Sequence, residues 1–153
     1  MINRHGFRRN NLVASGIVFL SNDPLHDEEC FRRMLGAEQK RTEQLNKSFM
    51  LMLIDVSALL QCKNARKIVQ KLLDAICAIT RETDIKGWHD ANKSIGIIFT
   101  EFDENFIDFI LSKLKVALHD TLTFEHGSLI HVSYIIFPRN RSANNIIVKL
   151  NAA

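Results

Sequence analysis

The stretch Phe49-Met50-Leu51-Met52-Leu53-Ile54-Asp55-Val56 decides the fold of this chain. Its apolar residues follow one another without alternating with polar ones, and the run has the length of a strand. Such continuity indicates that both faces of the strand are covered, as in a central strand flanked by helices. We therefore predict that this stretch forms the middle of a sheet, with Asp55 near the end of the strand.

The sequence on the C-terminal side of this strand completes the order β-α-β-β-α-β. Right-handed crossovers then place both helices on one face of a sheet with antiparallel strands, which is the ferredoxin-like α+β arrangement. The first and third strands are adjacent and central in that arrangement, so Asp55 should lie near the turn of the hairpin. The expected elements are a helix over 58–80, strands over 85–89 and 94–100 joined by Asp90-Ala91-Asn92-Lys93, a helix over 102–117, a strand over 129–137 and an edge strand over 146–150.

The chain ahead of the central strand divides into an arm and a helix. We predict that residues 1–22 form a basic arm with a short apolar segment at 13–20, and that residues 23–153 form a single α/β domain. Asp23-Pro24 is a favourable helix opening, because Asp can accept a hydrogen bond from the first turn and Pro loses none there. The helix expected over 24–47 is highly charged with a thin apolar stripe, so it packs lightly on the domain or pairs with a copy of itself.

Composition excludes several classes of function. The net charge of +3 is mild and no dense basic face with interleaved aromatic residues is visible, so nucleic-acid binding is not expected. No apolar run approaches the roughly 20 residues that span a bilayer, and the stretch 12–20 lacks the cleavage site of a secretion signal. The cysteines lack C-x-x-C spacing and the histidines lack the spacing of metal ligands, so we expect free thiols, no zinc and no cofactor. These features predict a cytoplasmic protein without membrane insertion.

Four local features follow one another along the chain: a charged helix before the central strand, an R-x-x-D motif, a hairpin and a last long strand. Lys40-Arg41-Thr42-Glu43 ends a charged helix ahead of the strand that closes at Asp55, and Arg81-Glu82-Thr83-Asp84 precedes the hairpin. His131-Val132-Ser133-Tyr134-Ile135-Ile136-Phe137-Pro138 forms the last long strand. In order and spacing these features resemble the GGDEF domain, a nucleotide cyclase fold whose members make cyclic di-GMP from two GTP molecules. The resemblance covers about residues 25–140 and implies the ferredoxin-like α+β fold with an N-terminal helix.

The resemblance breaks down at the residues that catalysis needs. A cyclase of this kind needs carboxylates for magnesium, glycines that let the backbone approach the phosphates, and polar groups that read guanine. Asp55 matches the family's first metal ligand, but the Gly-Gly-Asp/Glu-Glu-Phe signature has become Asp90-Ala91-Asn92-Lys93-Ser94-Ile95, without glycine. Leu60 replaces a phosphate-facing lysine, and Lys63 and Asn64 replace the Asn and Asp associated with the base. The sequence therefore predicts a degenerate GGDEF domain that does not catalyse the family's reaction.

Three hypotheses for function follow from the resemblance. The first is a catalytically inactive GGDEF-like domain acting as a signalling, regulatory or protein-interaction module, with a protein partner or self-association through helix 24–47. The second is an effector that binds cyclic di-GMP or another nucleotide through Arg81 and Asp84, because the family uses an R-x-x-D motif as an inhibitory site for that ligand. The third is a residual enzyme that acts on a nucleoside triphosphate through Asp55 and Asp90.

Each pair of candidate site residues also has a structural interpretation. Asp55 can cap the following helix and Asp90 can start a turn. We favour these roles over a metal pair, because a magnesium site with only two protein ligands normally depends on the phosphates of the substrate for its other ligands. Arg81 and Asp84 can form a salt-linked pair that closes the helix before them. The ligand-binding and structural interpretations of Arg81 and Asp84 both stay open at the level of the sequence.

Overall fold

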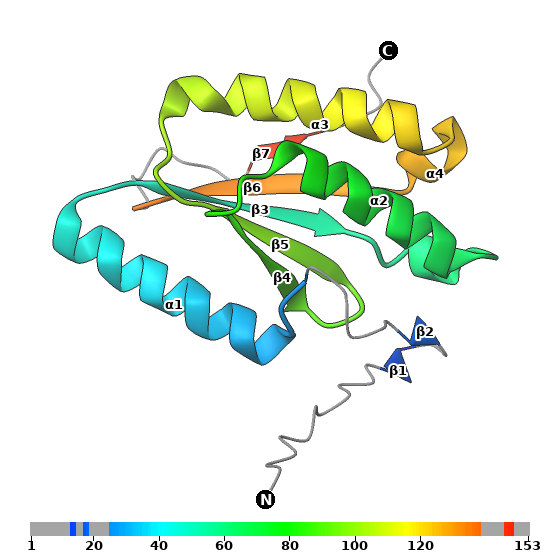
Figure 1. Cartoon of the computed structure of the whole chain (residues 1–153), viewed down its shortest axis with the longest axis horizontal. Coiled ribbons are helices and arrows are strands. Elements are labelled where there is room, and N and C mark those ends of the chain that lie inside the picture. Colours follow the sequence, from blue (N-terminus) through cyan, green and yellow to red (C-terminus); the bar gives the residue numbers. More distant parts are fainter. Residues whose placement is uncertain (1–12, 15–16, 19–24, 139–145, 149–153) are drawn as a thin grey trace, which may run out of the picture.

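The predicted central strand is β3 (Phe49–Asp55), and it lies in the middle of a five-stranded antiparallel sheet of order β4-β5-β3-β6-β7 (Figure 1). The computed structural model describes residues 13–14, 17–18, 25–138 and 146–148 of the chain. The other strands of the sheet are β4 (Ile85–Asp90), β5 (Ser94–Phe99), β6 (His131–Phe137) and β7 (Ile146–Val148). Because β3 pairs with β5 and β6, the predicted adjacency of the first and third core strands is confirmed.

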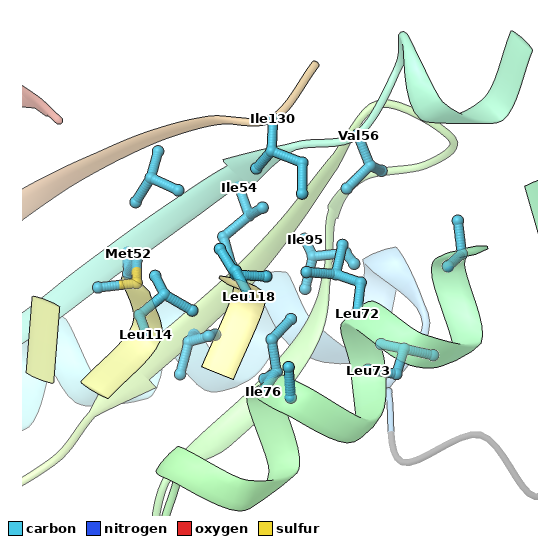
Figure 2. Close-up of a cluster of buried hydrophobic side chains, with 14 of the residues drawn as sticks. Met52, Ile54, Val56, Leu72, Leu73, Ile76, Ile95, Leu114, Leu118 and Ile130 are labelled. Carbon is cyan, nitrogen blue, oxygen red and sulfur yellow. The ribbon is translucent and has the colours of Figure 1, made fainter. Parts of the chain in front are cut away.

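Helices α2 (Ala65–Ile79) and α3 (Ile107–Thr121) cover one face of the sheet, as the ferredoxin-like arrangement predicts (Figure 1). Their inward apolar stripes pack on alternate side chains of β3, including Met52 and Ile54 (Figure 2). Burying a large apolar side chain of this kind contributes about 1.5–3 kcal/mol. The core of this layer also includes Val56, Leu72, Leu73, Ile76, Ile95, Leu114, Leu118 and Ile130.

Helix α1 (Glu28–Leu45) lies on the opposite face of the sheet (Figure 1). There Phe31 is fully buried with Phe49 and Leu51, the other alternate side chains of β3, so this strand is covered on both faces. The ring of Phe31 rests on two glycines: a Cβ on Gly96 would lie 2.5 Å from Phe31 Cζ, and one on Gly87 would lie 2.7 Å from Phe31 Cδ2. Glycine is therefore required at both positions for the helix to approach the sheet this closely.

Helix α1 is shorter than the predicted helix 24–47, which is corrected at both ends. Asp27 is its N-cap and accepts a hydrogen bond from Cys30 N at 2.7 Å, whereas Asp23 and Pro24 lie outside the described residues. The start is displaced because the chain just before it is extended: His26 forms a parallel bridge with Gly87 at the edge of β4. The helix ends where Asn46 adopts a left-handed conformation, with φ 51°.

Three further predicted boundaries are corrected. The helix predicted over 58–80 is a 3-10 turn, η1 (Leu59–Gln61), followed by α2, because Asn64 takes a left-handed conformation and the helix restarts there. The helix predicted over 102–117 is a 3-10 turn, η2 (Glu104–Phe106), followed by α3. The strand predicted from residue 129 starts at His131, since the chain before it forms the short helix α4 (Phe124–Ser128), which Thr123 caps.

The N-terminal arm predicted over residues 1–22 lies mostly outside the described residues. Two short antiparallel strands are described within it, β1 (Val13–Ala14) and β2 (Ile17–Val18). The short apolar segment predicted over 13–20 thus contains two short strands among its described residues. The division of the chain at residue 22 stays a prediction. Among the described residues, no helix has the length and apolar character needed to cross a membrane.

Candidate functional site

The candidate site lies where β3 ends beside the β4–β5 hairpin. In the sheet register Asp55 is paired with Ser94 on one side and His131 on the other. The predicted proximity of Asp55 to the hairpin turn is therefore present in the fold. The carboxylate of Asp55 is engaged locally: its Oδ1 accepts from Ser57 N at 2.9 Å and from Ser57 Oγ at 2.6 Å. These bonds make an Asx turn that leads the chain out of the strand.

The hairpin turn closes without glycine. Asn92 holds the left-handed conformation that the turn requires, with φ 66°, and Asn tolerates this region better than most residues. Lys93 N donates to Asp90 O at 3.1 Å, and Lys93 O accepts from Val56 N at 2.8 Å, which ties the hairpin to the end of β3. The hairpin is therefore closed by hydrogen bonds and by Asn92, in place of the glycines that the resemblance leads one to expect.

A cavity of about 410 Å³ lies between the hairpin and the ends of β3 and β6. The predicted pair Asp55 and Asp90 both line it, together with Lys93, so the structure brings the two carboxylates to one hollow. No group of three or more His, Cys, Asp or Glu residues placed to hold a metal ion occurs within residues 25–138. Two carboxylates with a lysine beside them do not fit the magnesium ion that the resemblance implies. The remaining lining residues are Leu53, His89, Ser94, His131, Val132 and Ser133.

His89 in the same cavity is a site residue to which the sequence assigned no role. Burial lowers the pKa of His89 below its ordinary value, and the Arg32 guanidinium lowers it further, against the Asp90 and Glu28 carboxylates, which raise it. Its imidazole stands edge-on to the Phe31 ring, with 6.4 Å between the ring centroids. The imidazole is therefore favoured in its neutral form, able to donate one hydrogen bond and accept another.

Glu28, in the first turn of α1, also contacts the hairpin tip. Its Oε2 accepts from Ala91 N at 2.7 Å, and its Oε1 pairs with Arg32 at 2.9 Å. The resemblance implies that substrate phosphates approach the backbone in this part of the hairpin. In this chain the Glu28 carboxylate already accepts the hydrogen bond from a backbone N–H of the turn. No sequence signal predicted this contact, because the two residues are 63 positions apart.

We expect Glu28→Ala to speed hydrogen exchange of the Ala91 amide and to lower the free energy of unfolding by roughly 1–2 kcal/mol, because a charged acceptor is lost at a half-buried N–H. Exchange measured by NMR and urea unfolding check the two effects. Glu29→Ala is the matched control, since Glu29 lies in the same helical turn but is exposed. Equal exchange at Ala91 in both variants would contradict the contact.

Arg81 and Asp84, the predicted R-x-x-D pair, form a closed unit after α2. Asp84 Oδ2 accepts from Arg81 N at 2.8 Å and from Arg81 Nε at 3.4 Å, and Oδ1 accepts from Arg81 Nη2 at 3.2 Å. Arg81 Nη2 also donates to Thr100 O at 2.7 Å, which links the end of β5 to this loop. The Asp84 side chain is 1% exposed and the Arg81 side chain 46%. The motif thus acts as the predicted salt-linked closure, with the guanidinium still reaching the surface.

The residues that stand where the resemblance expects phosphate and base contacts do not line the cavity. Leu60, which stands where the resemblance expects a phosphate-facing lysine, is buried in the core between β3 and α2. Lys63 is exposed, and Asn64 is the N-cap residue just before α2. Neither residue lines the cavity that holds Asp55 and Asp90.

Comparison with known proteins identifies the fold. No protein-family model matches the sequence, and no curated protein sequence matches it significantly. Among solved structures, the chain is similar to a "DGC protein" from Thermotoga maritima, at TM-score 0.61 and 13% identity over 76% of this chain and 87% of that one. It is also similar to the GGDEF domain of DgcB from Caulobacter crescentus, solved with c-di-GMP, at TM-score 0.57 and 12% identity over 73% and 71% of the two chains.

A third similar structure is a complex: diguanylate cyclase SiaD with its activator SiaC, from Pseudomonas aeruginosa. The TM-score is 0.56 and the identity 13%, over 77% of this chain and 50% of SiaD. At such low identity these likenesses establish the fold alone. The fold predicted from the resemblance, an α+β GGDEF-like domain with an N-terminal helix, is confirmed.

Proposed function

We propose that this chain, which has the GGDEF-like fold, does not synthesise cyclic di-GMP and acts as a regulatory or protein-interaction module in signalling. The observation that carries the proposal is the chemistry of the hairpin tip. Glu28 accepts a hydrogen bond from the Ala91 amide, and Lys93 lines the cavity together with Asp55 and Asp90. The Glu28 carboxylate at the turn would repel a triphosphate, and the Lys93 ammonium group would repel the metal ion that accompanies it. Asp55 and Asp90 are then the remnant of a metal-binding pair.

The module can pass on a signal because α1 is coupled to the hairpin. Phe31 packs on Gly87 and Gly96, Glu28 accepts from Ala91, and His26 extends the edge of β4. A partner that moves α1 would therefore move the hairpin with it. The outer side of α1 is charged, and its exposed large apolar residue is Leu45. SiaD has been solved with an activator protein, which supports a protein partner for a domain of this fold.

Incubation with GTP and either Mg²⁺ or Mn²⁺ should yield no cyclic di-GMP by chromatography, with an active diguanylate cyclase as the positive control. Calorimetric titration should show GTP binding no tighter than about 100 μM, or roughly −5.5 kcal/mol. Asp55→Asn is the matched variant. Turnover by the unmutated chain that disappears in Asp55→Asn would reject the proposal and establish the residual enzyme.

A second candidate function is binding of cyclic di-GMP or another nucleotide at Arg81. The observation that favours it is the half-exposed guanidinium, which lies 6.0 Å from the centre of the Phe106 ring and offers a cation beside an aromatic face. Asp84 would position Arg81 in this role. Titration of cyclic di-GMP into the unmutated chain and Arg81→Ala decides the matter: binding lost in the variant supports an effector, and no binding at high micromolar ligand ends the idea.

A further inference from the structure

We propose that the outer face of α2 and α3 is a self-association surface, and that a second copy of this chain docks on it about a two-fold axis. This face carries a groove of about 690 Å³ on the side of the two helices away from the sheet. Its apolar lining comes from both helices and consists of Ala75, Ala78, Ile79, Phe109, Val116 and Ala117. The proposal concerns assembly and does not depend on the loss of catalysis.

The groove is bordered by large apolar side chains in water. Phe109 is 49% exposed and Val116 is 61% exposed. They are seven residues apart on α3, two helical turns, and so lie on one stripe distinct from the inward stripe of Ile110, Leu114 and Leu118. A helix with two apolar stripes buries one against its own domain and leaves the other for a partner.

Charge selects a second copy as the occupant. The charged side chains that line the groove are Asp74, Lys113 and Asp120. Gln70 donates to Asp74, and the ammonium of Lys113 lies 4.7 Å from the centre of the Phe109 ring. His119 Nδ1 lies 3.5 Å from Asp120 Oδ1, and both of these side chains are largely exposed. Within residues 25–138, none of these three charges is paired with a lysine, arginine, aspartate or glutamate of the chain itself. The surface thus presents charges of both signs that a copy of itself can match.

The positions along α3 define the axis. Lys113 and Asp120 are separated by seven residues, roughly 10 Å along the helix, with Val116 between them. A two-fold axis at Val116, perpendicular to α3 and in the plane of the interface, brings Lys113 of each copy to Asp120 of the other. In such an isologous contact each ion pair forms twice, and Val116 packs against the same residue of the partner. An axis along the helix would instead oppose like charges.

Sedimentation velocity of the full chain, over a concentration series, tests the surface. We expect a dimer of micromolar affinity that Val116→Glu weakens at least 100-fold, because it places two carboxylates at the axis. Val116 is exposed, so the variant should fold, which circular dichroism checks. Lys113→Glu should weaken the dimer about tenfold, and Lys113→Glu with Asp120→Lys should restore it to within about threefold, since the swap rebuilds both ion pairs.

The controls keep the outcomes separate. Lys115→Glu makes the same charge change at an exposed lysine of α3 outside the groove and should leave the affinity within about twofold. Leu45→Glu tests the self-association first expected through helix 24–47. The proposal is overturned by a chain that stays monomeric throughout, which leaves the groove to another protein. A dimer lost in Leu45→Glu but kept in Val116→Glu, or a charge swap that fails to restore association, overturns it as well.

Discussion

Phe31→Ala should lower the free energy of unfolding by about 3–5 kcal/mol, a large fraction of the 5–15 kcal/mol by which a domain is usually stable. The Phe31 side chain is fully buried between α1 and the sheet, where it packs with Phe49, Leu51 and Ile98. Its removal leaves a cavity that Gly87 and Gly96 cannot fill, because glycine has no side chain. Urea unfolding followed by the fluorescence of Trp88, the chain's single tryptophan and a buried one, measures the change.

A double-mutant cycle shows whether the loss comes from this contact. Gly96→Ala alone should cost about 1–3 kcal/mol, because its Cβ would lie 2.5 Å from the Phe31 ring. In the Phe31→Ala background the same change should cost at least about 1 kcal/mol less, since the ring is gone and the next neighbour, His89 Cβ, lies 3.3 Å away. Leu45→Ala, at an exposed position of the same helix, should have little effect. Additive costs in the cycle would mean that α1 does not dock on the glycines.

Asp84→Ala should lower the free energy of unfolding by about 2–3 kcal/mol, because a buried carboxylate that accepts from the Arg81 amide and guanidinium is lost. Arg81→Ala should lower the free energy of unfolding by only about 1 kcal/mol. Water can replace part of its half-exposed side chain, and the backbone N–H of residue 81 still donates to Asp84 Oδ2. Asp84→Asn keeps one acceptor oxygen and should fall between them. Thermal and urea unfolding of the three variants give the ranking.

The order of these costs bears on the two interpretations of the R-x-x-D motif. If Arg81→Ala proved as costly as Asp84→Ala, the guanidinium would be the main structural element, and its use for a ligand would require breaking the loop. With the expected order, the carboxylate closes the loop, and the exposed part of the guanidinium could contact a ligand while Nη2 keeps its bonds to Asp84 and Thr100. The motif can then carry both roles at once.

Much of the architecture was accessible from local patterns. The continuous apolar run at 49–54 predicted a central strand, because covering both faces leaves no polar positions. The hairpin was predicted at its observed place, because Asp90 and Asn92, at and after the end of its first strand, are typical turn formers. Boundaries were less accurate: the helix start moved from residue 24 to Glu28, since the preceding residues pair with the edge of β4. Propensity near a helix end is weak, and a tertiary hydrogen bond outweighs it.

The candidate site divides in the same way. The proximity of Asp55 to the hairpin follows from strand order, so the sequence predicted it. The contact between Glu28 and Ala91 and the place of His89 were not predicted, because they depend on how α1 docks on a different segment. No periodicity in the sequence encodes such a docking, which is decided by a fit between the ring of Phe31 and two glycines.

By itself, the sequence determined the order of strands and helices, the burial of β3 and the absence of a glycine-rich, doubly acidic hairpin tip, because each depends on residues close together in the chain. Tertiary structure alone decided what now occupies that tip and which apolar stripe faces water. Both depend on how segments distant in the sequence pack together. The carboxylate of Glu28 reaches the turn, and the core buries one apolar stripe of α3 while Phe109 and Val116 stay exposed.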